Sequence, residues 1–246
     1  MTVSYRGFAP VYDILMSDHP YAARAEYLLG LFRKWDSEPK LMLDLACGSG
    51  RLTLELLRRG VDVIGVDPSE EMLMLAGKRM AAEGRSCLLL CQSGEHLDLY
   101  GTVDSAICTL DSINHVVEES DLLALLLRVH LFLEPNGLFL FDVNTEFKHQ
   151  NVLGNNTYVF DRDDVYCVWR NATRMPMTTV MLDYFVKHGE DYVRGSEEFE
   201  ERAWSEDELE RLLHQAGFTV EARYEDMTRR APSAATERVQ YVTRRV

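Results

Sequence analysis

The sequence predicts an α/β fold, with a doubly wound and mostly parallel sheet of seven strands that carries an antiparallel strand insertion. Glycine placement is the first reason, because four times an apolar run begins within two residues of a glycine that ends a helical pattern or a turn: RRG-VDVIGV, AAEG-RSCLLL, EPNG-LFLFDV and HQAG-FTVEARY. The second reason is that these runs are continuously apolar, as strands are when helices cover both faces of a sheet. The third is a change between residues 145 and 203, where short strand-like runs and hairpin turns replace the alternation of helix and strand.

The expected elements follow this alternation along the chain. Residues 1–37 are predicted to form a helical lead-in, because HPYAARAEYLLGLFRKW has amphipathic spacing. Strands are predicted at 41–46, 61–66, 86–92, 103–108, 138–143, 218–225 and 237–244, and helices at 51–59, 69–83, 119–133 and 205–216. The last helix opens with SEDE, in which Ser205 and Glu208 can form a capping box.

Two units follow from this pattern. Residues 1–144 and 204–246 are expected to form one ligand-binding domain with its helical lead-in, and residues 145–203 an antiparallel flap. In the flap YVF, VYCVW, TTVMLDYFV and DYVRG are typical of short strands, and HGED is the clearest hairpin turn. Because the flap follows the fifth strand, it is expected on the carboxyl side of the sheet, where ligands bind in open α/β sheets.

Composition and charge exclude several classes of function. The chain has 246 residues, with 26 Lys and Arg against 40 Asp and Glu, and the resulting net charge of −14 opposes nucleic-acid binding. No apolar run approaches the roughly 20 residues that cross a bilayer, and MTVSYRGFAP lacks the features of a signal peptide. We therefore expect a cytoplasmic protein without a membrane partner; the sequence leaves its oligomeric state open.

Metal binding is not expected. The five cysteines form no CxxC pair and their number is odd, which favours free thiols in a reducing compartment. Asp111, Asp142 and Asn144 offer the oxygen ligands that Mg²⁺ prefers. Acidic residues at strand ends more often serve caps and loops, so no metal is assigned.

The stretch LDLACGSGRLT at residues 43–53 is the strongest functional signal. It places Gly48 and Gly50 after an apolar strand, but Thr53 stands where a dinucleotide-binding fingerprint has its third glycine. Asp67 ends the next strand, where a carboxylate can accept hydrogen bonds from a ribose diol. Asp44 would repel a pyrophosphate but suits a ligand with an ammonium group. Together these features favour S-adenosylmethionine over NAD.

At these residues the chain resembles the class I S-adenosylmethionine-dependent methyltransferases, which have a Rossmann-like fold. The likeness is carried by LDLACGSGRLT, VIGVDPSEEML and LEPNGLFLFDVN, which together cover the sheet domain. FAPVYDILMSD, CTLDSINHV, DVNT and the strand-rich insertion add a narrower likeness to a bacterial group of small methyltransferases with an N-terminal Tyr-Asp motif. The likeness does not supply the methyl acceptor.

The resemblance implies a set of cofactor-binding residues. Asp67 would hold the ribose, Pro68 and Met72 would pack against adenine, and Tyr12 would close over the methyl and amino-acid portion. The methionine end and methyl group would be bordered by Asp44, Ala46, Gly48, Gly50, Cys108, Thr109, Leu110 and Asp111. The related group commonly ends its third strand in Gln-Asp-Met, whereas this chain has Gln92-Ser93-Gly94, so adenine recognition would rest on Ser93, on backbone groups at 93–94 or on Glu95.

Structural interpretations stand beside these roles. Asp44 can also cap neighbouring amides, although an acid inside an apolar strand is costly. Met72 matches a core position by pattern alone, and Cys47 matches a small buried residue. His115 follows the fourth strand and is the best-placed candidate for a general base, which is needed only if the acceptor must lose a proton. A lone histidine at such a position is often structural.

We therefore predict methyl transfer from S-adenosylmethionine to an N or O atom of a small-molecule acceptor. Two alternatives remain open, a methyltransferase acting on RNA or protein and a non-catalytic S-adenosylmethionine-binding module. The Pro-Pro turn of enzymes that methylate nucleic-acid or glutamine amino groups is absent, as is the Pro-Cys of cytosine-C5 enzymes. The flap is dense in rings that can line an acceptor pocket or form the flap's own core, namely Tyr158, Phe160, Tyr166, Trp169, Tyr184 and Phe185.

Overall fold

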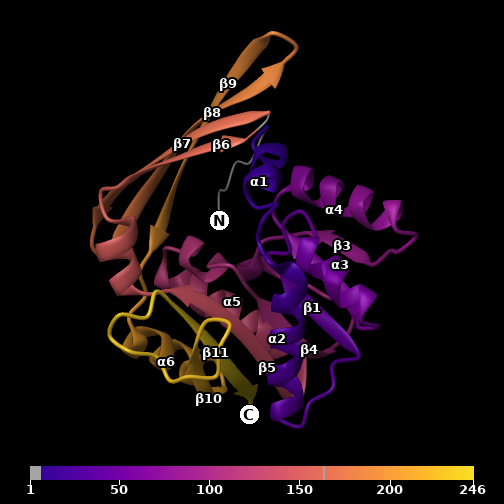
Figure 1. Ribbon diagram of the computed structural model, residues 1–246. Coiled ribbons are helices and arrows are strands. Elements are labelled where there is room, and N and C mark those ends of the chain that lie inside the picture. Colours follow the sequence, from indigo (N-terminus) through magenta and orange to yellow (C-terminus); the bar gives the residue numbers. More distant parts are fainter. Residues whose placement is uncertain (1–6, 163) are drawn as a thin grey trace.

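The predicted α/β architecture is confirmed in the computed structural model, which describes residues 7–162 and 164–246 (Figure 1). The part of the predicted lead-in at residues 1–6 lies outside the described residues. The central sheet has seven strands in the order β10-β11-β5-β4-β1-β2-β3. They are β1 (Leu41–Leu45), β2 (Asp62–Asp67), β3 (Leu88–Cys91), β4 (Val103–Cys108), β5 (Leu133–Asn144), β10 (Phe218–Glu225) and β11 (Arg238–Arg245). The first five run parallel, and β11 is antiparallel to both β5 and β10.

Helices cover both faces of this sheet, as the continuously apolar strands require. Helices α2 (Tyr21–Lys34), α3 (Arg51–Arg58) and α4 (Glu70–Ala82) pack in one cluster with Leu138 and Leu140 of β5. Helices α5 (Glu119–Phe132) and α6 (Glu206–Gln215) pack in another with Phe139 and Phe141, the alternate residues of the same strand. The predicted capping box of α6 is present, because the Ser205 hydroxyl accepts from the Glu208 N–H and the Glu208 carboxylate accepts from the Ser205 N–H.

Boundaries differ from the predictions by a few residues in most elements. The largest difference in the central sheet is at β5, which begins at Leu133 rather than at residue 138. The EPNG segment was interpreted as a turn that precedes the strand, and Asn136 does adopt a left-handed φ of 64°. Leu133 nevertheless pairs with Val103 of β4, so the chain enters the sheet before this turn.

A second, four-stranded antiparallel sheet forms the flap. Its strands are β6 (Thr157–Arg162), β7 (Val165–Arg174), β8 (Met177–His188) and β9 (Asp191–Arg202), in that order. The flap leaves the central sheet after β5 through η3 (Lys148–Leu153), and β9 leads into α6. β9 extends beyond the predicted DYVRG run. Its second half, SEEFEER, has too few apolar residues for the sequence to indicate a strand there.

Helix α1 (Ala9–Leu15) joins the flap to the central domain. Figure 1 shows it between flap strand β6 and helix α4. Phe8 and Val11 pack in one apolar cluster with Cys167, Val180 and Leu182 from the inner face of the flap. Helix α1 of the lead-in therefore packs against the inner face of the flap. Among the described residues, no helix is long and apolar enough to cross a membrane.

Candidate active site

The turn after β1 exposes backbone to the carboxyl edge of the sheet. Ala46, Gly48 and Gly50 adopt left-handed φ values of 58°, 55° and 72°. A Cβ at Gly48 would meet nothing within 4 Å, so this position is open. A Cβ at Gly50 would lie 2.7 Å from the Cβ of Ala76, so this glycine lets the start of α3 pack closely on α4. Gly48 therefore leaves open space beside the turn, whereas Gly50 allows the close contact between α3 and α4.

Asp67 holds this turn from the end of β2. One of its carboxylate oxygens accepts the Gly48 N–H at 2.8 Å and the other accepts the Ser69 N–H at 2.9 Å. The side chain is 6% exposed, and burial raises its pKa. Each carboxylate oxygen retains a lone pair, so the group can still accept hydrogen bonds from a ligand.

Thr53 explains the missing third glycine of the turn. Its hydroxyl donates to the Asp44 carboxylate at 2.6 Å, and both side chains are buried. Burial raises the pKa of Asp44 to about 7, and the Thr53 hydrogen bond opposes this rise. The position that is glycine in a dinucleotide site is therefore used here to hold an acid inside the sheet.

Asp13 attaches α1 to the Gly turn. Its carboxylate accepts from the Ser49 hydroxyl at 2.6 Å, from Arg51 at 2.7 Å and from Arg79 at 2.6 Å. These partners hold α1 in place, and the adjacent Tyr12 lines the cavity described in the next paragraph. The Tyr-Asp pair of the N-terminal motif thus divides between a cavity wall and a structural anchor, a role for Asp13 that the sequence did not indicate.

A cavity of about 240 Å³ lies between the carboxyl edge of the central sheet and the inner face of the flap; we call it the main cavity. It brings together most of the predicted site residues, namely Tyr12, Ala46, Gly48, Asp67, Pro68, Met72, Leu110, Asp111 and His115. Asp44 lines a smaller cavity of about 50 Å³ that shares Tyr12, Ala46, Gly48 and Leu110 with it. Gly94 and Cys108 line a third of about 10 Å³, and Gly50 and Ser93 line none of the three.

The loop after β4 is held in an unusual backbone shape. Leu110 and Asp111 have left-handed φ values of 59° and 58°, and Asp142 accepts both of their N–H groups, at 2.9 and 2.8 Å. Asp142 is fully buried and pairs with Arg24 at 3.3 Å and Arg238 at 3.2 Å. Its oxygens are thus directed at guanidinium and backbone N–H groups. In residues 7–162 and 164–246, no three His, Cys, Asp or Glu side chains are grouped as a metal site would need.

The flap side of the main cavity has an apolar wall and an ionisable end. Phe160 and Trp169 belong to the wall together with Phe199, Leu153 and Leu182. Other rings of the predicted aromatic group lie elsewhere: Tyr166 is 40% exposed, and Tyr184 is buried against Phe8 with ring centroids 5.3 Å apart. Of the six rings, Phe160 and Trp169 thus line the cavity, and Tyr184 belongs to the flap's own apolar cluster.

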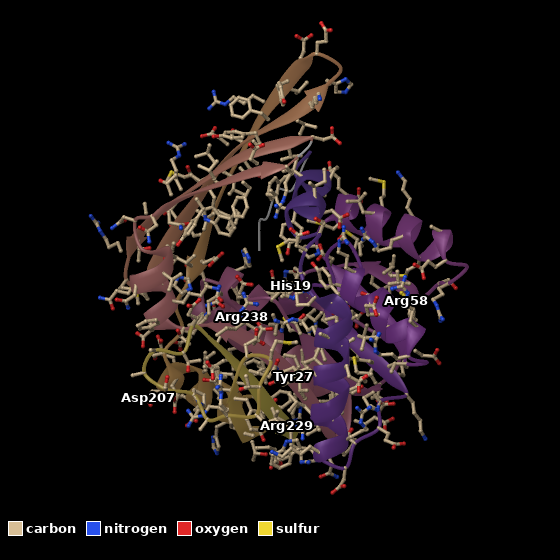
Figure 2. All side chains as sticks on the ribbon, viewed as in Figure 1. His19, Tyr27, Arg58, Asp207, Arg229 and Arg238 are labelled. Atoms are coloured by element: carbon tan, nitrogen blue, oxygen red, sulfur yellow. The ribbon has the colours of Figure 1, made fainter. Side chains whose placement is uncertain are left out.

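The ionisable end gathers side chains from distant parts of the chain. It consists of Asp111, His115, Lys148, Glu201 and Arg238. Arg238 donates to Asp111 at 2.9 Å, and Figure 2 places it where the flap meets the central sheet. Burial lowers the pKa of His115, which keeps its ring neutral at pH 7. Sequence reasoning missed Lys148, Glu201 and Arg238. The glutamate-rich second half of β9, which carries Glu201, has too few apolar residues to indicate a strand.

Comparisons with known proteins agree with this geometry. Residues 42–137 match the family profile described as a methyltransferase domain. A Bacillus subtilis (strain 168) protein that is named as a methyltransferase, YqeM, is 32% identical over 237 residues, covering 96% of this chain and 94% of its own. The chain belongs to the class I S-adenosylmethionine-dependent methyltransferases.

Solved methyltransferase structures share the fold over the whole chain. The crystal structure of an S-adenosylmethionine-dependent methyltransferase from Clostridium acetobutylicum is 30% identical, with a TM-score of 0.89 and 98% of each chain covered. An amino pentose methyltransferase of Micromonospora echinaspora, solved with S-adenosylmethionine, is 18% identical, with a TM-score of 0.77 and 100% of this chain and 99% of its own covered. Flap and lead-in are therefore included in the likeness.

Proposed function

We propose that this methyltransferase transfers the methyl group of S-adenosylmethionine to an N or O atom of a small-molecule acceptor. One observation carries the proposal: the Gly turn and Asp67 share a single cavity with the aromatic and ionisable side chains of the flap. A methyl donor on one side and an acceptor on the other would thus meet without crossing solvent. Transfer from an activated sulfonium needs mainly close positioning and exclusion of water.

The residues on the central-sheet side fit the cofactor. Asp67 has lone pairs for the ribose hydroxyls, Pro68 and Met72 offer an apolar surface for adenine, and Gly48 leaves room for close approach. Asp44 supplies a buried negative charge for the ammonium of the methionine end. Ser93 and Gly94 begin η1 (Gly94–His96) beside the small third cavity, and we propose that adenine is recognised there through backbone groups.

The flap side favours a small acceptor over RNA or protein. Its apolar wall and ionisable end lie between the two sheets in a cavity of about 240 Å³, and the net charge of −14 gives no general attraction for phosphate. The amino pentose methyltransferase with the same fold is named for a small acceptor. We propose His115 as the general base, because its ring lines the cavity and its pKa, lowered by burial, leaves it free to take a proton.

Two measurements test this function. Calorimetry should detect binding of S-adenosylmethionine and S-adenosylhomocysteine and no binding of NAD; NAD binding alone would overturn the cofactor assignment. Incubation of the protein and methyl-labelled donor with a metabolite extract, an RNA fraction and a protein fraction should label the metabolite fraction. Label in RNA or protein would favour the macromolecular alternative, and no label in any fraction, despite tight cofactor binding, would favour a non-catalytic module.

A further inference from the structure

Glu201 is a buried acid with one carboxylate oxygen that has no hydrogen-bond partner in the described part of the chain. It lies on β9, is 3% exposed and lines the main cavity. Its Oε2 atom has no hydrogen-bond partner among the described residues. The nearest ring nitrogens, Nε2 of His115 and Nε2 of His149, are each 3.9 Å from a carboxylate oxygen, which is beyond hydrogen-bond distance. A buried polar atom left in this state is costly unless a ligand satisfies it.

The surrounding charges are balanced without Glu201. Among the buried and half-buried groups, three acids, Asp111, Asp142 and Asp226, stand against three cations, Arg24, Lys148 and Arg238; Glu237 is exposed. Burial raises the pKa of Glu201 to about 8, and the negative charge of Asp111 adds to the rise while Lys148 and Arg238 oppose it. The pKa of His149 is lowered by burial to about 4, so its ring brings no charge. Without a ligand, Glu201 is therefore mostly protonated at pH 7.

We propose that Glu201 binds the cationic amino group of the methyl acceptor, so that the acceptor is an amine carried on an apolar or ring-shaped body. This inference rests on the proposed function and narrows its N or O atom to N. The ammonium group supplies both the missing hydrogen-bond donor for Oε2 and the missing counter-charge. The ring or chain of the acceptor lies against the aromatic wall formed by Phe160, Trp169 and Phe199.

An acidic acceptor fits the same end less well. Arg238 already donates to Asp111 and Asp142, and Lys148 donates to the Asn144 side chain at 3.0 Å. Both cations thus have partners in the protein, whereas Glu201 Oε2 has none within residues 7–162 and 164–246. A carboxylate or phosphate would also add a negative charge to a cluster whose acids and cations are already balanced.

The proton balance of the reaction follows from this contact. The ammonium nitrogen, held by the Glu201 carboxylate, gives one proton to the neutral ring of His115 and becomes a neutral amine. Its lone pair forms the new N–C bond, the C–S bond breaks, and the electron pair stays on sulfur. The products are S-adenosylhomocysteine and the methylated ammonium ion, and the proton leaves from His115 to solvent.

The test uses three probes with one ring and different head groups: benzylamine, benzyl alcohol and benzoate. Each is titrated into the protein saturated with S-adenosylhomocysteine at pH 7, for the wild type, Glu201→Gln and Glu200→Gln. Glu200 is the matched control because it is the exposed neighbour on the other face of β9. We expect benzylamine to bind about tenfold or more tightly than the other two probes, since it forms a charge-assisted hydrogen bond.

Proton release on benzylamine binding provides a second readout. It would be unchanged in Glu201→Gln if Glu201 had only a structural role. Benzylamine binding should release up to one proton at pH 7 in the wild type and in Glu200→Gln, measured by calorimetry in buffers of different ionisation enthalpy. Glu201→Gln should abolish both the release and the preference for the amine. Equal affinities, a preference for benzoate, no binding of any probe, or an unchanged preference in Glu201→Gln would each overturn the proposal. If S-adenosylhomocysteine itself fails to bind the wild type, the proposed function fails as well.

Discussion

The central-sheet side and the flap side of the site hold their acids in opposite ways. On the central-sheet side, Asp67 accepts two backbone N–H groups, and in the adjoining smaller cavity Asp44 accepts the Thr53 hydroxyl, so both carboxylates are oriented before any ligand arrives. On the flap side, Glu201 has an oxygen without a hydrogen-bond partner among the residues that the structure describes. The first arrangement suits a ligand common to the whole family, and the second leaves a group to be satisfied by one particular acceptor. The difference suggests that the cofactor side is preorganised and that specificity lies in the flap.

The largest expected effect is on the central-sheet side of the main cavity, with Gly48, Asp67, Pro68 and Met72, which we call the proposed cofactor wall. Asp67→Ala should weaken S-adenosylmethionine binding at least tenfold, because it removes ligand hydrogen bonds to a charged acceptor that are worth about 1.5–3 kcal/mol. It also releases the Gly48 and Ser69 N–H groups that the carboxylate now holds. Asp62→Ala, at the exposed start of the same strand, is the control. Calorimetry checks both, and an unchanged dissociation constant for Asp67→Ala would remove the ribose assignment.

Asp44 should give cofactor binding a defined pH dependence. Its pKa of about 7 is raised by burial, and only the ionised form attracts the ligand's ammonium. Affinity should therefore rise with pH, roughly tenfold between pH 6 and pH 8, as the ionised fraction grows from about 9% to about 91%. Asp44→Asn should flatten the profile, and Thr53→Val should move its midpoint to higher pH because it removes the hydrogen bond that favours ionisation. Affinity that falls with rising pH would contradict the assignment.

A smaller effect is expected from the attachment of α1. Asp13→Asn weakens the contacts with Arg51 and Arg79, so Tyr12 is held less firmly over the cavity. S-adenosylhomocysteine affinity should fall by about threefold to tenfold, in line with the modest worth of partly exposed ion pairs. Asp18→Asn, which affects only the exposed pair with Arg162, should have no such effect. Equal behaviour of the two variants would show that α1 does not position the cofactor wall.

The sequence predicts the residues of the two walls unequally, because one wall comes from neighbouring strand ends and the other from distant parts of the chain. The proposed cofactor wall comes from residues 43–72 and the loop near 110, where each predicted residue directly follows a strand end, so the sequence could predict that these residues meet. The ionisable end joins Asp111, Lys148, Glu201 and Arg238, whose meeting depends on how the flap folds back over the sheet. The glutamate-rich half of β9 gave no strand signal, and Thr53 was noticed only as a missing glycine.

The smallest effect is expected at Ser93. This residue lies outside the three cavities and just before η1, so its side chain contributes little to the cofactor wall. Ser93→Asp restores the acid that the related group carries, and should tighten S-adenosylmethionine binding or leave it unchanged, within about threefold. Calorimetry measures the change. A marked loss of affinity would mean that the backbone at 93–94 has adapted to serine or that adenine lies elsewhere.

The division between the two walls is tested most directly by the melting shift that S-adenosylhomocysteine produces in Trp169→Ala. Trp169 lines the flap wall, and Tyr166→Ala, on the outer face of the same strand, controls for the loss of an aromatic ring. A ligand that binds only the folded protein raises the melting temperature. Truncating a packed ring lowers the stability of the ligand-free protein by about 3–5 kcal/mol at most. Because each variant is melted with and without ligand, this loss of stability is distinguished from a loss of binding. We predict that Trp169→Ala keeps the wild-type shift while turnover of a labelled acceptor falls. A folded Trp169→Ala protein that loses the shift would place the flap in the cofactor site and contradict the account.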